Sequence, residues 1–343
     1  MVMENLVSSW CTTVKSLPQN YVFPEDARPG NKIVPIFKNC PIIDLEKAVS
    51  DRNNAIQQIL QACQDYGLFQ VINHGVCEDL IKDTIGIVKE FFNMPNEDKA
   101  SLYSLDPQKS CRLYTSSFDY ARESIHVWRD VLKHPSHPLE EWVDSWPPKP
   151  SKYRDVVGKY SVEVRNLSLR ILGMICEGLE LKPRYFGDEL TGVQTLLSNH
   201  YPPCPDPSLA LGISKHSDPY IITILYQENI GGLQVMKDGQ WFGVEPVANA
   251  FVVNIGLLLK VISNGKLESA EHRVVTNSKE SRYTIASFIN TRSDIVIEPA
   301  KALLEKNDCR PLYRAFSLKD FQQTHKEHRG EGEATLEVFK IEG

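Results

Sequence analysis

The sequence predicts a mainly β protein with flanking helices, built as a sandwich or jelly roll. From about Gln194 onward, apolar residues come in short runs that are rich in β-branched and aromatic side chains and are separated by turn residues. Asp238-Gly239 lies between two of these runs, which is a strong signal for a tight β-hairpin. The 343 residues are enough for one large core or for two modest domains.

The first half is expected to be mainly helical around one strand. Apolar residues recur at helical spacing over residues 56–63 and 80–91, and the second of these helices stops before a proline. The run 68–72 predicts a strand between them. One apolar face continues over residues 153–174, which predicts the longest helix and a brace for the core. Residues 135–150, rich in proline and tryptophan, predict a loop.

The second half is expected to consist of short strands, followed by a capping helix and a loose, charged end. The expected strands are residues 221–226, 233–236, 241–244, 251–254, 258–262, 282–289 and 294–297. The predicted organisation is a region of helices and joining strands (1–145), a bracing-helix region (146–193), the jelly-roll core (194–300) and a C-terminal helix and tail (301–343).

Composition and charge argue against several classes of protein. A formal net charge of -6 makes a duplex nucleic-acid binder a poor fit, while the hydrophobic fraction of 42% is ordinary for a globular protein. No apolar run approaches the ~20 residues that span a bilayer, and no secretory signal is found, so a cytoplasmic protein is expected. The 8 cysteines form no C-x-x-C pair and are expected to be free thiols. No coiled coil or large apolar stripe is present, so we expect a monomer.

Candidate metal ligands begin with His216-Ser217-Asp218, just before an expected strand. Residues i and i+2 of an extended chain share a face, so the imidazole and the carboxylate can reach the same ion. The triplet alone is a weak signal in a chain with 9 histidines. His272 follows at a distance that fits an adjacent strand, and two histidines with one carboxylate form the ligand set of non-haem Fe(II) oxygenases.

A candidate carboxylate site follows ten residues after His272. Strand alternation places Arg282, Thr284, Ala286 and Phe288 on one face. A guanidinium beside a hydroxyl can bind a carboxylate, because arginine presents two parallel N–H donors.

Other histidines are less informative. His325 and His328 lie in a run of charges near the end of the chain and are expected on a solvated face. His74 ends an expected strand and is expected to form structural hydrogen bonds.

Nearly end to end, the chain resembles the plant 2-oxoglutarate- and Fe(II)-dependent dioxygenases. The segments that carry the resemblance, in the family's order, are Pro41-Ile-Ile-Asp-Leu45, Gly67-Leu-Phe-Gln-Val-Ile-Asn-His-Gly75, Asn199-His-Tyr-Pro-Pro-Cys-Pro205, His216-Ser-Asp218, Thr223-Ile-Leu225, Gly232-Leu-Gln-Val235, Asp238-Gly-Gln-Trp241, Asn254-Ile-Gly256, Ser263-Asn-Gly265 and His272-Arg-Val-Val-Thr-Asn277. Residues 17–22 and 102–117 resemble salicylate hydroxylases, and residues 254–264 and 298–301 resemble hyoscyamine hydroxylases. The mugineic-acid dioxygenases are similar too.

The resemblance implies a double-stranded β-helix (jelly roll) and a set of cofactors. It implies that His216, Asp218 and His272 bind Fe(II), and that 2-oxoglutarate and O2 are co-substrates, with ascorbate as a stimulant. It also implies that Arg282 and Thr284 bind the far carboxylate of 2-oxoglutarate. Tyr201 would contribute a hydroxyl, and Asn199 would steady the same region. The implied reaction hydroxylates a C–H bond of a small specialised metabolite or hormone (a phenolic acid, flavonoid or alkaloid) and releases succinate and CO2.

The substrate is expected to lie against apolar side chains with a few polar groups. The expected substrate-facing residues are Phe288, Tyr114, Phe118, Trp128, Tyr220 and Leu257. The chain departs from the family's pattern at Thr284, where relatives usually carry serine, and at Leu257, where many carry aspartate. Thr115-Ser-Ser117 is neutral where the tropane enzyme carries acids, which weakens the case for an amine-bearing alkaloid.

Three alternatives remain open from the sequence. The same chemistry can end in desaturation, epoxidation or O-demethylation. A non-catalytic jelly-roll protein that only binds a metal is disfavoured, because metal binding alone does not require the carboxylate-binding Arg282. A zinc hydrolase is also disfavoured, because it usually recruits a separate acidic base and no H-E-x-x-H motif is present.

Overall fold

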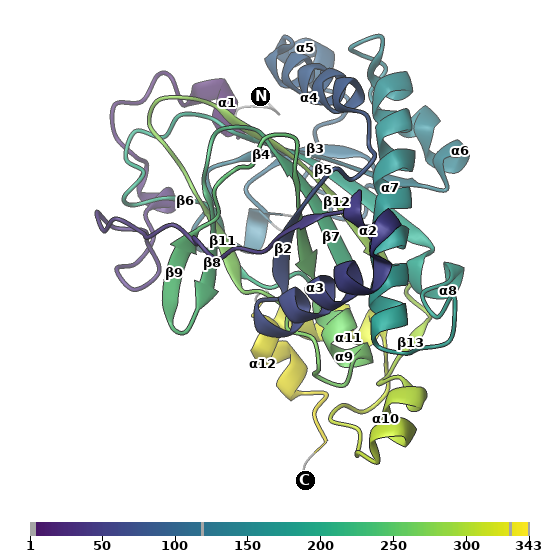
Figure 1. Ribbon diagram of the computed structural model, residues 1–343. Helices are drawn as coiled ribbons and strands as arrows, with labels where there is room; N and C mark the ends of the chain where they lie inside the picture. Colours follow the sequence, from purple (N-terminus) through teal and green to yellow (C-terminus); the bar gives the residue numbers. More distant parts are fainter. Residues whose placement is uncertain (1–4, 118–119, 329–330, 342–343) are drawn as a thin grey trace.

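The computed structural model describes residues 5–117, 120–328 and 331–341 of the chain. Two sheets form a sandwich flanked by helices, which confirms the predicted fold class (Figure 1). The larger sheet has eight strands in the order β1 (Ile42–Asp44), β2 (Leu68–Ile72), β10 (Phe251–Ile255), β7 (Ile222–Gln227), β12 (Arg282–Asn290), β5 (Val193–Tyr201), β4 (Asp130–His137) and β3 (Arg112–Thr115). The smaller sheet has four strands in the order β6 (Leu211–His216), β11 (His272–Val275), β8 (Leu233–Lys237) and β9 (Gln240–Gly243).

The hairpin predicted at Asp238-Gly239 joins β8 to β9. Lys237 pairs with Gln240, so the loop contains only the two predicted residues. Both have positive φ angles, 49° and 75°, which is the conformation that a tight two-residue hairpin requires.

Strand β12 shows how the large sheet separates its two faces. Tyr283 and Ser287 contact residues on the face that the helices cover, where Tyr283 stacks on a histidine ring 4.5 Å away. Arg282 instead donates a hydrogen bond to the loop between β7 and β8. Successive side chains of a strand point to opposite faces, so Thr284 and Phe288 share this inner face with Arg282.

Three helices cover the outer face of the large sheet. They are α3 (Arg52–Asp65), α4 (Glu78–Asn93) and α7 (Tyr153–Gly178), and α7 contacts the other two as well as β7 and β12 (Figure 1). The long helix predicted over residues 153–174 is therefore present and braces the sheet. In the part of the chain that the structure describes, no helix is both long enough and apolar enough to cross a membrane.

Two local expectations are wrong. The loop expected over residues 135–150 begins inside β4 and continues as α6 (Leu139–Trp142). A proline removes one backbone donor, and the pairing of β4 with β5 shifts in register just after Pro135. The strand expected over residues 258–262 is the helix α9 (Leu257–Ile262), in which every side chain except Lys260 is buried. Four of the five residues in the run 258–262 are apolar, and so short a run has no periodicity that distinguishes a buried helix from a buried strand.

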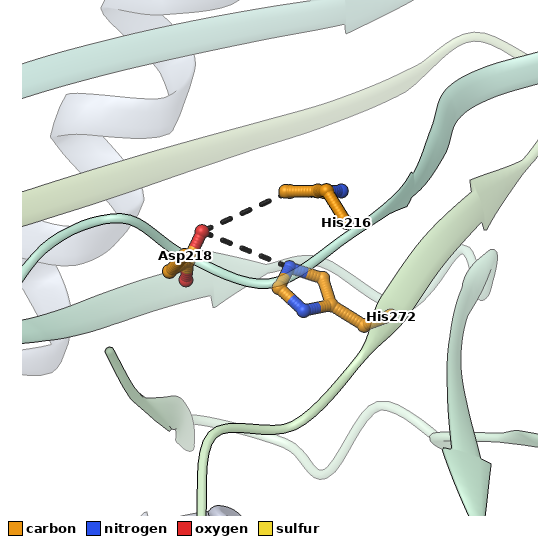
Figure 2. Close-up of side chains that lie close together, drawn as sticks. All are labelled: His216, Asp218 and His272. Carbon is orange, nitrogen blue, oxygen red and sulfur yellow. Dashed lines mark ion pairs between the residues drawn. The ribbon is translucent and has the colours of Figure 1, made fainter. Parts of the chain in front are cut away.

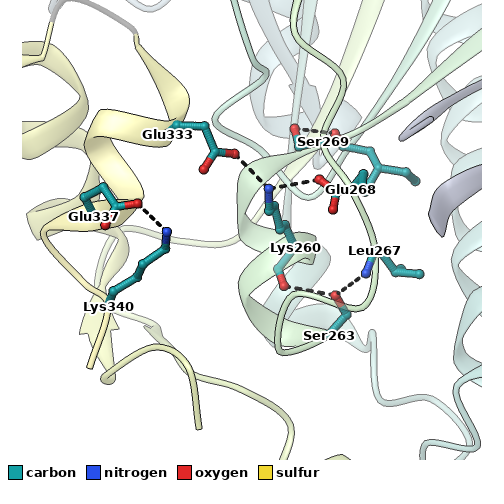
Figure 3. A network of polar contacts seen from close by, with 9 residues as sticks. Lys260, Ser263, Leu267, Glu268, Ser269, Glu333, Glu337 and Lys340 are labelled. Carbon is teal, nitrogen blue, oxygen red and sulfur yellow. Dashed lines mark hydrogen bonds and ion pairs between the residues drawn. The ribbon is translucent and has the colours of Figure 1, made fainter. Parts of the chain in front are cut away.

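The C-terminal region folds back onto the core instead of ending loosely. β14 (Phe316–Ser317) pairs with β13 (Val296–Ile297), and α11 (Leu318–Glu327) and α12 (Gly332–Glu337) follow. Figure 3 shows Lys260 of α9 between Glu268 and Glu333, with N–O distances of 3.0 and 2.7 Å. The ion pair between Lys260 and Glu333 connects α12 to α9. Shorter helices are α1 (Val7–Trp10), α2 (Lys47–Ser50), α5 (Asn96–Lys99), α8 (Asp188–Thr191) and α10 (Lys301–Asn307).

Candidate metal centre and anion site

His216, Asp218 and His272 lie side by side, although His272 is far from the other two in the sequence (Figure 2). His216 ends β6 and His272 begins β11, and the two residues are directly opposite each other in that antiparallel pair. Asp218 lies in the loop that leads to β7. Its Oδ1 is 3.8 Å from His216 Nε2 and 3.9 Å from His272 Nε2. The three donor atoms all lie within 4.8 Å of one another.

Backbone carbonyls orient both imidazoles. His216 Nδ1 lies 2.8 Å from Ser214 O, and His272 Nδ1 lies 3.0 Å from Ala270 O. An Nδ1–H that donates to a carbonyl leaves the Nε2 lone pair free to bind a metal. Burial, followed by the proximity of His272, holds the pKa of His216 well below its usual range, so this imidazole is neutral at physiological pH.

The donor set fits a divalent ion that keeps open positions. Nitrogen and oxygen donors lie about 2.0–2.2 Å from such an ion, so donors roughly 3–4 Å apart can share it. The Asp218 and His272 side chains are only 4% and 7% exposed, whereas His216 is 24% exposed. Ligands can therefore approach from the His216 side.

Strand β10 and the turn after it hold the Asp218 loop. Asn254 Nδ2 donates to Asp218 Oδ2 at 3.3 Å, and the Leu257 N–H donates to Asp218 O at 2.8 Å. Gly256 approaches the loop so closely that an added Cβ would lie 1.9 Å from Tyr220 O. Sequence reasoning did not assign Asn254 to the site; the available signal was a single polar residue in the otherwise apolar, fully buried β10.

Arg282 forms a second polar site, on the inner face of β12. Its side chain is enclosed, and it donates from Nε to Ile230 O at 3.0 Å and from Nη2 to Gln227 Oε1 at 2.9 Å. Nη1 has no hydrogen-bond partner within the described residues. An enclosed, charged N–H without a partner is costly, so this atom is suited to bind an anion.

The other three residues expected at this site lie beside Arg282. Tyr201 and Asn199 are opposite Arg282 and Thr284 in the pairing of β5 with β12. The Tyr201 ring lies 5.2 Å from the Arg282 guanidinium carbon. Asn199 Nδ2 donates to Thr284 Oγ1 at 3.2 Å, which leaves the Thr284 hydroxyl proton free to donate to a ligand.

Three of the expected substrate-facing residues lie near these groups. Phe288 and Tyr220 pack against each other with ring centroids 4.5 Å apart. Burial, together with nearby Asp218 and Tyr114, raises the pKa of Tyr220, which places Tyr114 in the same neighbourhood. Phe118 lies outside the described residues.

Trp128 and Leu257 are enclosed in the hydrophobic interior instead of facing the site. Trp128 is 0% exposed, packs edge-on against Trp10 and Tyr21, and donates from Nε1 to Pro202 O. Leu257 is also 0% exposed and belongs to the main core. These two side chains are therefore less suited to contact substrate than Phe288 and Tyr220.

Arg129, which sequence reasoning did not identify, lies at the site next to Trp128. Its Nη1 donates to Asn199 Oδ1 at 3.2 Å, and its Nε donates to Ser116 O at 2.9 Å. Its charge also contributes to the lowered pKa of His216. No motif in the sequence distinguished Arg129 from a surface residue.

The C-terminal helices lie against the loop that carries Asp218. A Cβ added to Gly332 of α12 would lie 2.9 Å from Cβ of Ser217, the residue between His216 and Asp218. His325, expected on a solvated face, is instead half-buried, stacks on Phe321 and lies 3.2 Å from Thr335 Oγ1. His74 forms the expected structural hydrogen bonds, with Asn249 O and with a backbone N–H.

Comparisons with known proteins agree with this chemistry. Residues 192–291 match the 2OG-Fe(II) oxygenase superfamily, and residues 40–149 match the family described as non-haem dioxygenase in morphine synthesis N-terminal. The chain is 43% identical to hyoscyamine 6-dioxygenase from Hyoscyamus niger over 99% of both proteins. It is 41% identical to protein DOWNY MILDEW RESISTANCE 6 from Arabidopsis thaliana, over 94% of this chain and 95% of that protein.

A solved structure extends the similarity to three dimensions. The crystal structure of JOX2 in complex with 2OG, Fe and JA matches with a TM-score of 0.86 and 33% identity, over 98% of each chain. Sequence similarity of this extent, over nearly the whole length, identifies the family. The chain belongs to the plant 2-oxoglutarate- and Fe(II)-dependent dioxygenases and is an enzyme that uses Fe(II), 2-oxoglutarate and O2.

Proposed function

We propose that this enzyme hydroxylates a C–H bond of a small specialised metabolite, with His216, Asp218 and His272 as the Fe(II) ligands. Arg282 and Thr284 would bind the far carboxylate of 2-oxoglutarate. The observation that carries this assignment is that Arg282 Nη1 has no hydrogen-bond partner among the described residues and lies beside a hydroxyl that is free to donate. A dicarboxylic co-substrate would satisfy both donors.

The protein's own residues then position and shield the reacting groups. When bound, Fe(II) and 2-oxoglutarate supply the activation of O2 for C–H oxidation, with release of succinate and CO2. The carbonyls of Ser214 and Ala270 keep both Nε2 atoms directed at the ion, and Asn254 holds the carboxylate of Asp218. The C-terminal helices limit the access of water to the ligand loop.

The substrate class is supported by the relatives and by the aromatic side chains at the site. The relatives include a hyoscyamine and a flavanone dioxygenase, which supports an alkaloid or a flavonoid as the substrate of this chain. The phenolic acid is supported by the resemblance to salicylate hydroxylases. Phe288 and Tyr220 would supply an aromatic wall for such a molecule. Desaturation, epoxidation and O-demethylation remain alternative outcomes of the same chemistry.

The test is to look for the Fe(II)·2-oxoglutarate complex directly. Anaerobic addition of Fe(II) and 2-oxoglutarate to the full-length protein should produce a weak visible charge-transfer band. His216→Ala should lose the band, because one of three protein ligands is missing. Absence of a band in the unmodified protein, with tight zinc binding and hydrolytic turnover instead, would refute the proposal.

The substrate should emerge from a screen of phenolic acids, flavonoids and alkaloids that is read as substrate-dependent succinate release. A monomeric, cytoplasmic enzyme also remains our prediction. Size-exclusion chromatography with light scattering would test whether the enzyme is a monomer. Imaging of a tagged chain in plant cells would test whether it is cytoplasmic.

A further inference from the structure

Positively charged residues continue along the inner face of the large sheet beyond Arg282. One row across β12, β5, β4 and β3 consists of Thr284, Asn199, Val131 and Tyr114. The next row consists of Ala286, Leu197, Lys133 and Arg112. Two residues along a strand cover about 7 Å and return to the same face. Lys133 and Arg112 therefore lie one row beyond the residues that we assign to 2-oxoglutarate.

Lys133 faces inward and has no counter-ion among the residues that the structure describes. The residue after it, His134, points the other way, is 0% exposed and lies 2.9 Å from the Tyr153 hydroxyl of α7. Lys133 itself is half-buried, and its ammonium group forms no hydrogen bond or ion pair with any residue that the structure describes. Burial, and then Arg112, lower the pKa of Lys133. A bound anion would favour the charged form again.

Arg112 adds a second positive charge at this place. It is directly opposite Lys133 in the pairing of β3 with β4, and its guanidinium stacks on the Tyr114 ring at 4.2 Å. An anion bound at Lys133 would therefore lie near Arg112 as well.

An aromatic pair lies between the same inner face of the sheet and the metal ligands. Phe288 lies one row further along β12, opposite Thr195, and packs on Tyr220. Tyr220 in turn is close enough to Asp218 for that carboxylate to affect its pKa. A molecule with an apolar body and one anionic end would match both features.

We propose that Lys133 binds a carboxylate of the substrate, so that this enzyme acts on an aromatic or otherwise apolar carboxylic acid. The inference rests on the proposed function, because it requires the substrate to lie on the face beside the Fe(II) ligands. The carboxylate of 2-oxoglutarate has its own donors in Arg282 and Thr284. Lys133 is therefore a candidate residue for determining substrate specificity, and it does not bind the metal.

The test compares carboxylic acids with their methyl esters. Benzoic, cinnamic, indole-3-acetic and dodecanoic acids, each paired with its ester, are titrated into the anaerobic, Fe(II)- and 2-oxoglutarate-loaded enzyme and followed by calorimetry. At least one acid should bind about tenfold or more tightly than its ester, since a charge-assisted hydrogen bond is lost on esterification. Lys133→Met should abolish that preference, and Lys133→Arg should keep most of it. Lys47→Met removes a lysine that is 80% exposed and should change nothing.

Each outcome separates this inference from the proposed function. If no acid binds more tightly than its ester, or if Lys133→Met keeps the preference, the inference is wrong. It is also wrong if Lys133→Met raises the requirement for 2-oxoglutarate, because Lys133 would then serve the co-substrate. The charge-transfer band should persist in Lys133→Met; its absence from the unmodified enzyme would instead contradict the proposed function.

Discussion

Arg282 places a charged group inside the protein with one guanidinium nitrogen, Nη1, that has no hydrogen-bond partner among the described residues. Burial of a charge is tolerated when each of its donors finds an acceptor. Here Ile230 O accepts from Nε and Gln227 Oε1 accepts from Nη2, whereas Nη1 has no acceptor in the described part of the chain. A carboxylate supplied by a co-substrate explains why this arrangement is retained.

We therefore expect Arg282→Ala to raise the 2-oxoglutarate concentration for half-maximal activity by about thirtyfold or more. Truncation of one partner of a buried charge pair costs about 2–5 kcal/mol of binding free energy. Arg282→Lys should have an intermediate effect, because lysine keeps the charge but lacks the planar fork. Succinate formation measured against 2-oxoglutarate concentration tests both. Arg292→Ala, whose side chain is 63% exposed, is the matched control, and an unchanged requirement in Arg282→Ala would contradict the assignment.

The sequence revealed the candidate metal ligands better than the residues around them. His216, Asp218 and His272 combine an unusual residue set with a spacing that chemistry restricts. Arg129 and Lys133 have no such pattern, because an isolated cation on a strand usually faces solvent. Alternation makes neighbours point to opposite faces, so the position of the strand decides whether Trp128 or Arg129 faces the site, and sequence alone does not fix it.

At the scale of elements, the turn after β10 determines where the ligand loop lies. Gly256 N–H donates to Ile221 O at 3.0 Å, and the next residue bonds to Asp218 O. The contact leaves no room for a side chain at Gly256, since a Cβ would overlap Tyr220 O. The loop and the turn can therefore move only together.

Gly256→Ala should destabilise the protein and weaken Fe(II) binding. Overpacking costs about 1–3 kcal/mol of folding stability, and displacement of the loop would separate Asp218 from the two histidines. Urea denaturation and titration of the charge-transfer band with Fe(II) measure the two effects. Gly173→Ala in α7 is the control, because an added Cβ there would have nothing within 4 Å, and it should stabilise the protein by about 0.5–1 kcal/mol. Normal Fe(II) affinity in Gly256→Ala would show that the contact does not position Asp218.

Long periodic elements were predictable and short apolar ones were not. One continuous apolar face predicts the helix over residues 153–178. The turn residues Asp238-Gly239 predict the hairpin. The sequence of helix α9 resembles that of a strand because every side chain except Lys260 is apolar and buried. The docking of α12 depends on Lys260 meeting Glu333, a contact between segments far apart in the sequence.

At the scale of the whole molecule, buried neutral histidines link folding to pH. His134 lies between β4 and α7, where its Nε2 is 2.9 Å from the Tyr153 hydroxyl and its ring packs on Trp146. Burial lowers the pKa of His134 to about 4. In the unfolded chain its pKa returns to about 6.5. The unfolded chain therefore takes up a proton first as the pH falls.

The neutral His134 side chain contributes about 3 kcal/mol to the free energy of unfolding. This contribution is fully present above about pH 6.5 and is lost as the pH falls towards 4. His134→Gln keeps a hydrogen-bonding group but cannot titrate. We expect this variant to be less stable than the unmodified protein at pH 7.5. Between pH 7.5 and 5, however, it should lose about 2 kcal/mol less of its free energy of unfolding. Urea denaturation of both proteins with a metal chelator present measures the difference, because the metal ligands titrate equally in each. Parallel losses of stability would show that His134 is already protonated, or solvated, in the folded protein.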